Sequence, residues 1–468
     1  MKRDRTEIFE CQRTLPAVLR LGLPTIAGQV ILVLYNLADT FFIGLTENDA
    51  KLISVTVCMP AFMVLSAIAN LFGVGGTSAI SRAFGKKDEG RAGQSGAFAL
   101  WGAAVVTLLY CLLIWLLADP IVDLLGGAHR DVHASAKTYL LVTVALGGFC
   151  TTGSNLLAHL IRTEGNAAIS GIGIILGGLL NIGLDPLFMF VLLPAGQEVF
   201  GAALATALAN LLSFLYFLLA LAWIRRKGSR LRFFANFNFL RNGVPREVMS
   251  TGLSACLMTL FENVSYAILG ANMAHWGVAA QAGIGVAKKV NMLAHCAVRG
   301  IAQGVLPLLA YAYASGNRAR MKNVLRISIT ASVSVSALLM GANLLLSRQL
   351  VGLFLPAGES KDFSAAFLRI LCLGCPFSAL GYTIISFFQA VNQGGKSFLL
   401  ASLRKGAIDI PLMFLLQTAF GASGLVMATP LADLLCCCAA ALLLGRWFYR
   451  TSTHELPHLT ARERMAHA

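Results

Sequence analysis

Twelve apolar stretches follow one another along the chain and leave very few folds open to it. A helix of about 20 apolar residues crosses the hydrocarbon core of a bilayer, and only helices or closed barrels satisfy their backbone hydrogen bonds there. With 57% hydrophobic and 13% charged residues, the 468-residue chain has too little polar surface for a water-soluble protein of this size. The sequence therefore predicts an all-α integral membrane protein. The predicted helices cover residues 15–45, 52–78, 93–118, 134–159, 166–193, 199–224, 248–275, 280–311, 324–347, 364–391, 397–419 and 423–447.

Basic residues are concentrated in every second loop between these helices. They fall at Arg82 to Arg91, at Arg225 to Arg246 and at Arg318 to Arg326. Loops rich in Lys and Arg stay in the cytoplasm. This places both termini in the cytoplasm and predicts a multi-pass cell-membrane protein, of the inner membrane in a bacterium. Because these loops account for much of the net charge of +15, we expect no nucleic-acid partner.

The longest basic stretch divides the chain into two similar halves. Gly201 to Leu212 aligns without gaps on Gly424 to Leu435, with seven identities in twelve positions. An even number of helices per half gives parallel repeats, related by an axis along the membrane normal. We expect two six-helix lobes related by such a pseudo-twofold axis. The predicted parts are an N-lobe over residues 1–224, a cytoplasmic basic linker over 225–246, a C-lobe over 247–450 and a cytoplasmic tail over 451–468.

Asp39 and Asp185 lie inside predicted membrane helices, where acids are rare and usually functional. Asn36 precedes Asp39 by three residues and Asn181 precedes Asp185 by four, so each pair shares one helix face. Hard oxygen ligands suit Na⁺, and two facing carboxylates in a low dielectric suit H⁺. The alternative is that each acid only caps a neighbouring helix or pairs with a base. The predicted cation-coupling set is Asn36, Asp39, Asn181, Asp185, Thr206 and Asn210.

Pro24 lies in the first predicted helix, about four turns before Asp39. A proline inside a helix removes one backbone hydrogen bond and favours a kink. Two interpretations stay open: a static kink, or a bend whose balance depends on the charge at Asp39. The second gives Pro24 a role in the mechanism.

The second half contains a basic stripe on its second helix. Lys288, His295 and Arg299 share one face of that helix, and Glu262 lies in the middle of the preceding one. The stripe is either a buried ion-pair network that fixes helix packing or a surface that faces substrate. The acids available to neutralise it are Glu262, Asp409 and Asp433.

No catalytic motif accompanies these groups. The chain has no His-Glu-x-x-His and no Gly-x-Ser-x-Gly sequence. Gly394 to Ser397 reads like the end of a phosphate loop, but Ala390 stands where the first glycine is required. We therefore expect neither an enzyme nor an organic cofactor.

Three motifs resemble the MATE family of multidrug efflux transporters: Tyr35 to Gly44, Gly75 to Asp88, and Arg162 to Asn166 with Leu184 to Phe188. The resemblance covers nearly the whole chain. It implies twelve helices in two lobes and export of amphipathic, often cationic drug-like compounds by Na⁺ or H⁺ antiport. It also implies a cation site in the N-lobe. By motif match, the cation ligands, which are metal ligands if Na⁺ is the coupling ion, are Asp39, Asn181, Asp185 and Thr206.

The second half departs from one branch of that family. Glu262 resembles the C-lobe glutamate of the branch, but the helix around Pro376 to Gln389 has no carboxylate to match its aspartate. The alternative function is a lipid-linked saccharide flippase of the same superfamily. A flippase would have a strongly cationic central cavity, so the positions of Lys288, Arg299 and Arg404 separate the two. We expect a monomer whose partners are small molecules and the lipid bilayer.

Overall fold

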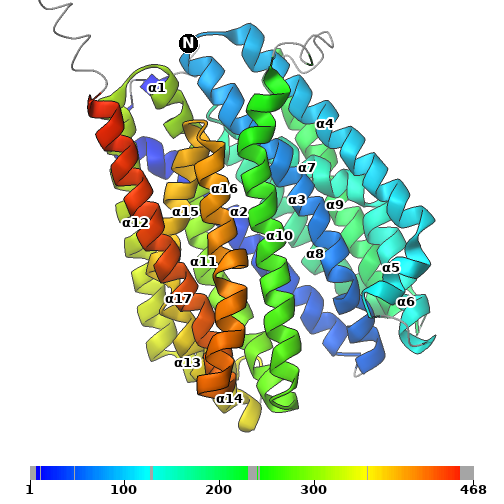
Figure 1. Cartoon of the computed structure of the whole chain (residues 1–468). Coiled ribbons are helices and arrows are strands. Elements are labelled where there is room, and N and C mark those ends of the chain that lie inside the picture. Colours follow the sequence, from blue (N-terminus) through cyan, green and yellow to red (C-terminus); the bar gives the residue numbers. More distant parts are fainter. Residues whose placement is uncertain are drawn as a thin grey trace, which may run out of the picture.

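The computed structural model describes residues 7–10, 12–46, 48–126, 130–194, 196–229, 240, 243–355 and 357–453, and regular structure in this part is helical throughout (Figure 1). The helices of the first half are α1 (Glu7–Glu10), α2 (Thr14–Gly44), α3 (Asp49–Gly85), α4 (Glu89–Leu116), α5 (Ala118–Leu124), α6 (Arg130–Leu140), η1 (Leu141–Leu146), α7 (Gly148–Arg162), α8 (Ala167–Pro186), η2 (Leu187–Leu192) and α9 (Glu198–Arg226). Those of the second half are α10 (Val244–Ala274), α11 (Val278–Ala314), α12 (Arg318–Leu345), α13 (Ser347–Gly352), α14 (Glu359–Cys372), α15 (Cys375–Ala390), α16 (Gly394–Ser402), η4 (Leu403–Ala407) and α17 (Asp409–Thr453).

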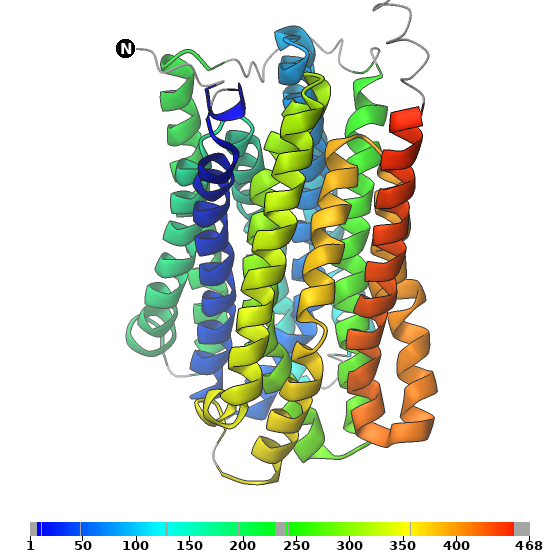
Figure 2. The same cartoon turned by 90° about the vertical axis from the view of Figure 1, so that its left-hand side faces the viewer.

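The predicted membrane protein with many crossings is confirmed. Nine helices of the described part are long and apolar enough to cross a bilayer, and two bent helix pairs raise the number to eleven. One of the nine is a 58-residue stretch, Gly394–Thr451, which contains Gly421 with φ 61° and ψ −139°. The chain reverses its direction there (Figure 2). Counted on both sides of this turn, the stretch supplies two crossings and the total is twelve.

Two of the predicted helices are not continuous. The predicted span over residues 134–159 is a pair of helices bent by 47° on either side of Gly147, and the span over 364–391 is bent by 46° between α14 and α15. A third irregularity follows Pro186, where α8 passes into the π-helix η2. The proline lacks the N–H that would continue the α-helical pattern, and π-bulges are frequent at functional sites.

The helices form two lobes, with α2 to α9 in the N-lobe and α10 to α17 in the C-lobe. The two lobes meet where α3 packs against α10 and α2 packs against α11. The described part of the predicted linker consists of residues 225–229, 240 and 243–246, and residues 454–468 of the predicted tail lie outside the described residues. The start of α2 and the end of α17 lie at the same end of the molecule (Figure 1).

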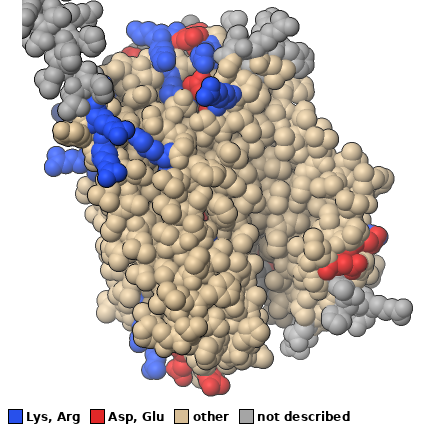
Figure 3. Space-filling view, in the orientation of Figure 1, with Lys and Arg blue, Asp and Glu red and all other residues tan. Residues whose placement is uncertain are grey.

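This end of the molecule also carries most of the visible basic side chains, and we call it the basic end (Figure 3). Between it and the opposite end, which we call the far end, the visible surface is almost free of charge (Figure 3). An uncharged belt of this kind suits contact with lipid acyl chains. The loops that form the basic end are those that the positive-inside rule assigned to the cytoplasm.

Glycines let the two lobes approach closely on the side of the basic end. A Cβ atom added at Gly300 of α11 would lie 2.6 Å from the Cα of Ile26 in α2, and one at Gly304 would lie 2.8 Å from the carbonyl of Leu21. On the neighbouring pair of helices, Gly252 of α10 faces the carbonyl of Leu71 in α3 at contact distance. The lobes are therefore in backbone contact in the half of the molecule next to the basic end.

Candidate functional site

Two buried acids mark the far-end half of the N-lobe. Asp39 lies near the end of α2 and is 3% exposed, and Asp185 near the end of α8 is fully buried. Asn181 lies one turn before Asp185 and contacts it, with 3.4 Å between its Nδ2 and the Oδ1 of Asp185. The same amide nitrogen donates to the Thr206 hydroxyl of α9 at 3.2 Å. Because α2 packs against α8 and the charges of Asp39 and Asp185 interact, three helices converge in this region.

Three oxygen atoms at this place are buried without a hydrogen-bond donor. They are Oδ1 of Asp39, Oδ1 of Asn181 and Oδ2 of Asp185. Neither acid has a basic side chain within ion-pair distance in the described part of the chain, although the charge of Lys289 in α11 acts on Asp39. Buried acceptors that lack donors cost free energy. A bound cation or proton removes that cost, so the donor set fits Na⁺ or H⁺.

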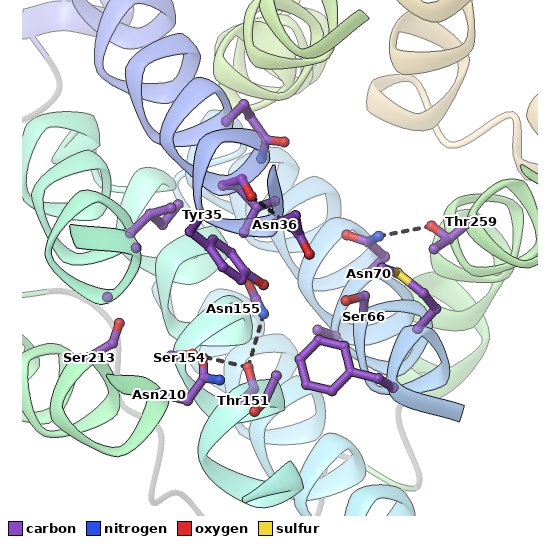
Figure 4. Close-up of a pocket in the computed structure, with 18 of the residues that line it drawn as sticks. Tyr35, Asn36, Ser66, Asn70, Thr151, Ser154, Asn155, Asn210, Ser213 and Thr259 are labelled. Carbon is purple, nitrogen blue, oxygen red and sulfur yellow. Dashed lines mark hydrogen bonds between the residues drawn. The ribbon is translucent and has the colours of Figure 1, made fainter. Parts of the chain in front are cut away.

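Asn36 and Asn210 lie on the wall of a cavity beside these acids. The Asn36 amide donates to the carbonyl of Leu32 at 2.7 Å, and the Asn210 amide donates to the carbonyl of Thr206 at 3.0 Å. Both side chains line the cavity (Figure 4), and Asn181 and Thr206 line it too. The six predicted N-lobe residues therefore form one continuous region, in which the acids occupy the buried part.

The cavity has a volume of about 280 Å³ and lies between the two lobes. Gln29 of α2 and Asn70 of α3 line it on the far-end side of the contacts at Ile26 and Leu71, and Gln303 of α11 lines it at the level of those contacts. Asn70 donates across it to Thr259 of α10 at 3.0 Å (Figure 4). Amide and hydroxyl groups make up much of the wall. Polar residues of the wall that can be seen in Figure 4 are Tyr35, Asn36, Ser66, Asn70, Thr151, Ser154, Asn155, Asn210, Ser213 and Thr259.

In the C-lobe, Glu262 pairs with the basic stripe on α11. Its Oε2 lies 2.8 Å from Nη2 of Arg299, and Tyr382 of α15 contacts both side chains. Glu262 and Arg299 line the cavity, and so does His295, whose ring nitrogen lies 3.1 Å from the Ser378 hydroxyl. The stripe thus contains an ion pair at the cavity wall.

Lys288 does not line this cavity. Its ammonium donates to the carbonyl of Tyr266 at 2.9 Å and lies 4.7 Å from the centre of the Tyr266 ring. Arg162, at the end of α7, does line the cavity; it begins one of the family motifs but was not among the predicted site residues. It donates to the carbonyl of Ala158 and to the Ser170 hydroxyl.

Asp409 and Asp433, the other two acids available to the stripe on α11, form their ion pairs with residues outside it, although their charges also act on Lys288 and His295. Asp433 pairs with Arg404 at 2.8 Å, and Asp409 lies 3.5 Å from the ammonium of Lys405. All four side chains are buried in the C-lobe, 1% exposed or close to it. Arg404 and Lys405 belong to the π-helix η4, whose changed residue spacing turns two consecutive basic residues into the lobe.

Pro24 lies inside α2, which continues through it as a helix. The neighbouring helix α8 has Gly171 at this point, where a Cβ atom would lie 2.6 Å from the carbonyl oxygen of Pro24. The proline therefore lies at a close contact between α2 and α8, the two helices that carry Asp39 and Asp185.

An ion-pair cluster joins the lobes at the basic end. Arg82 of α3 and Arg91 of α4 contact the two carboxylate oxygens of Glu247 in α10, at 3.0 and 2.8 Å. Arg82 also donates to the carbonyls of Gln389 and Ala390 in α15. These residues come from distant parts of the sequence, so no local pattern predicts the cluster.

Comparisons with known proteins agree with the family resemblance and with the fold. The MatE family model matches residues 24–187 and 254–415. The multidrug export protein MepA of Staphylococcus aureus is 27% identical over 444 residues, which are 95% of this chain and 96% of that protein. Its counterpart in Staphylococcus haemolyticus is 27% identical over 93% of this chain and 94% of its own length. A solved structure described as the outward-facing conformation of a multidrug resistance MATE family transporter aligns with a TM-score of 0.85 and 23% identity, over 96% of this chain and 99% of that one.

Proposed function

The chain belongs to the MatE family, and we propose that it is a secondary antiporter that exports amphipathic, often cationic organic compounds in exchange for Na⁺ or H⁺. One observation carries this proposal. Asp39, Asn181 and Asp185 leave three buried acceptor oxygens without donors, next to a cavity that both lobes line. Binding of a cation would stabilise these acceptor oxygens, and the adjacent cavity has room for an organic molecule.

The orientation follows from the loop charges. The positive-inside rule puts the basic end and both chain termini in the cytoplasm of a cell membrane, and the similarity to staphylococcal proteins favours a bacterial membrane. The lobes touch at the basic end and the cavity lies beyond their contacts. In this orientation, the contacts at the basic end support an outward-facing state.

Export then proceeds by alternating access. In the outward-facing state, the N-lobe acids take up a cation while the substrate leaves the cavity. To face inward, the lobes must separate at Glu247 and close at the far end, after which the cation leaves and a new substrate enters. The substrate is carried only if the charge state of Asp39 and Asp185 shifts the balance between the two states, and a few kcal/mol of differential interaction suffices.

The positions of the basic groups favour export over saccharide flipping. Of the three residues that separate the alternatives, Arg299 alone lines the cavity, and Glu262 neutralises it. Lys288 is held by Tyr266, and Arg404 is buried with Asp433. Arg162 also lines the cavity and has no acid partner in the described part of the chain. A diphosphate group would require a cavity richer in unpaired positive charge than this one guanidinium provides.

Proteoliposomes with imposed gradients test the proposal directly. The purified protein is reconstituted, and uptake of a fluorescent organic cation is followed with an outward Na⁺ gradient alone, an outward H⁺ gradient alone, or neither. We expect one of the two gradients to drive accumulation above the level in protein-free liposomes. Accumulation that is equal under all three conditions would contradict antiport.

Pro24 gives a second prediction. If α2 has two bends whose balance follows the charge at Asp39, then Pro24→Ala restores a backbone hydrogen bond, favours one form and slows transport while cation binding persists. Spin labels near Arg20 and Gly44 should show a distance that changes with Na⁺ or pH in the wild type and stays constant in Pro24→Ala. The matched control is Pro60→Ala, which removes a proline from inside α3. If the spin-label distance in the wild type changes with neither Na⁺ nor pH, the bending hypothesis is wrong and the lobes move as rigid bodies.

A further inference from the structure

The C-lobe contains a counterpart of every residue in the N-lobe cation region. Asn36 and Asp39 are three apart, as are Glu262 and Ser265. Asn181 and Asp185 are four apart, as are Lys405 and Asp409, and the same spacing separates Thr206 from Asn210 and Thr429 from Asp433. The paired residues come from corresponding helices of the two halves. The correspondence is Asn36 with Glu262, Asp39 with Ser265, Asn181 with Lys405, Asp185 with Asp409, Thr206 with Thr429, and Asn210 with Asp433.

The C-lobe set is assembled around Asp409 as the N-lobe set is assembled around Asp185. The Ser265 hydroxyl donates to Oδ2 of Asp409 at 2.6 Å, and the Thr429 hydroxyl donates to Oδ1 at 3.1 Å. The ammonium of Lys405 lies 3.5 Å from Oδ2 of the same carboxylate. In the N-lobe, Asn181 contacts both Asp185 and Thr206, and the charges of Asp39 and Asp185 interact. The equivalence therefore holds in space as well as in sequence.

The two sets differ in their charge. In the N-lobe set, Asp39 and Asp185 have no ion-pair partner in the described part of the chain, and three oxygens lack donors. In the C-lobe set, Lys405 neutralises Asp409, whose two oxygens both have partners. Arg404 forms an ion pair with Asp433, although Oδ2 of Asp433 accepts no hydrogen bond. A positively charged side chain therefore stands where the N-lobe set has a neutral amide.

We propose that the C-lobe retains the counterpart of the N-lobe cation site and that the ammonium of Lys405 fills it permanently. The Lys405 ammonium is then the permanent ligand of this second site, and free ions exchange only at the N-lobe site. The statement that ions exchange at the N-lobe site rests on the proposed antiport function. Removing the ammonium opens the site to a free cation, Na⁺ or H⁺, at Asp409.

The test uses the purified full chain with the N-lobe site disabled by Asp185→Asn. Lys405→Asn gives the C-lobe the amide that the N-lobe has, whereas Lys405→Arg keeps a tethered charge and is the matched control. Thermal unfolding of both variants is measured in NaCl and in choline chloride, and at neutral and acidic pH. Since a ligand that binds only the folded state raises the Tm, we expect NaCl or acid to raise the Tm of the Lys405→Asn protein. The Lys405→Arg protein should respond to neither.

Each outcome decides the proposal. Equal responses of the two variants to NaCl and to acid would overturn it. If Lys405→Asn does not fold in choline chloride at neutral pH, recovery of folded protein in NaCl or in acid supports the proposal, and failure to recover in either contradicts it. Because no transport is measured, the result is independent of the proposed function. The proposed function would be contradicted separately if substrate uptake by wild-type proteoliposomes responded to neither the Na⁺ nor the H⁺ gradient.

Discussion

Asp39→Asn and Asp185→Asn should each reduce gradient-driven export to the level of protein-free liposomes. An amide has the shape of the carboxylate and forms hydrogen bonds, but it cannot gain or lose charge when an ion binds. Both acids are buried, and each has an oxygen atom without a donor, so replacement by an amide removes an unpaired acceptor and should leave folding intact. Expression and elution volume should match those of the wild type.

The matched control for these variants is Asp123→Asn. Asp123 lies in the short helix α5 outside the membrane-spanning helices, and its side chain is 55% exposed. The control makes the same chemical change, and its export should equal that of the wild type. Full export by either N-lobe variant would show that the coupling cation binds elsewhere.

Asp433→Asn should produce the largest loss of stability. Arg404 and Asp433 have side chains that are 1% exposed, and they form an ion pair at 2.8 Å. Removing one partner leaves a buried guanidinium without its counter-charge, which typically costs about 3 kcal/mol or more of unfolding free energy. We expect a Tm several degrees below that of the wild type in detergent, together with a lower yield of folded protein.

The control for this variant removes an exposed ion pair. Arg348 and Asp362 lie 3.3 Å apart, with side chains that are 71% and 70% exposed. Exposed pairs contribute about 0 to 1 kcal/mol, so Asp362→Asn should leave the Tm within measurement error. Arg404 also donates to the Ser378 hydroxyl at 2.8 Å and lies 4.0 Å from the centre of the Tyr382 ring. A Tm of Asp433→Asn equal to that of Asp362→Asn would mean that these two contacts suffice to hold Arg404.

The crossings and the N-lobe acids could be predicted from the sequence because each depends on a local signal. Apolar length defines a membrane helix, and an acid inside one is conspicuous, as Asp39 and Asp185 are. The positions of Asn181 and Thr206 beside Asp185 follow once the helix directions are known. Such inferences need only helix geometry.

Other features depend on contacts that no local pattern contains. Glu247 meets Arg82 across 165 positions of sequence, and many basic residues near the basic end compete for such a partner. Arg404 and Lys405 point into the C-lobe because a π-helix changes the residue spacing there. An assumption of regular α-helix could not reveal this, so the sequence did not identify Lys405 and Arg404 as the ion-pair partners of Asp409 and Asp433.

Each lobe begins and ends at the basic end, because each crosses the membrane an even number of times. A duplicated copy of such a lobe, joined behind the first, enters the bilayer in the same orientation without any change in its loop charges. A lobe with an odd number of crossings would need the opposite charge bias in its second copy. Gene duplication could therefore produce a working pair in one step. Substitutions such as a lysine for an asparagine could then accumulate in one copy while insertion of both stayed the same.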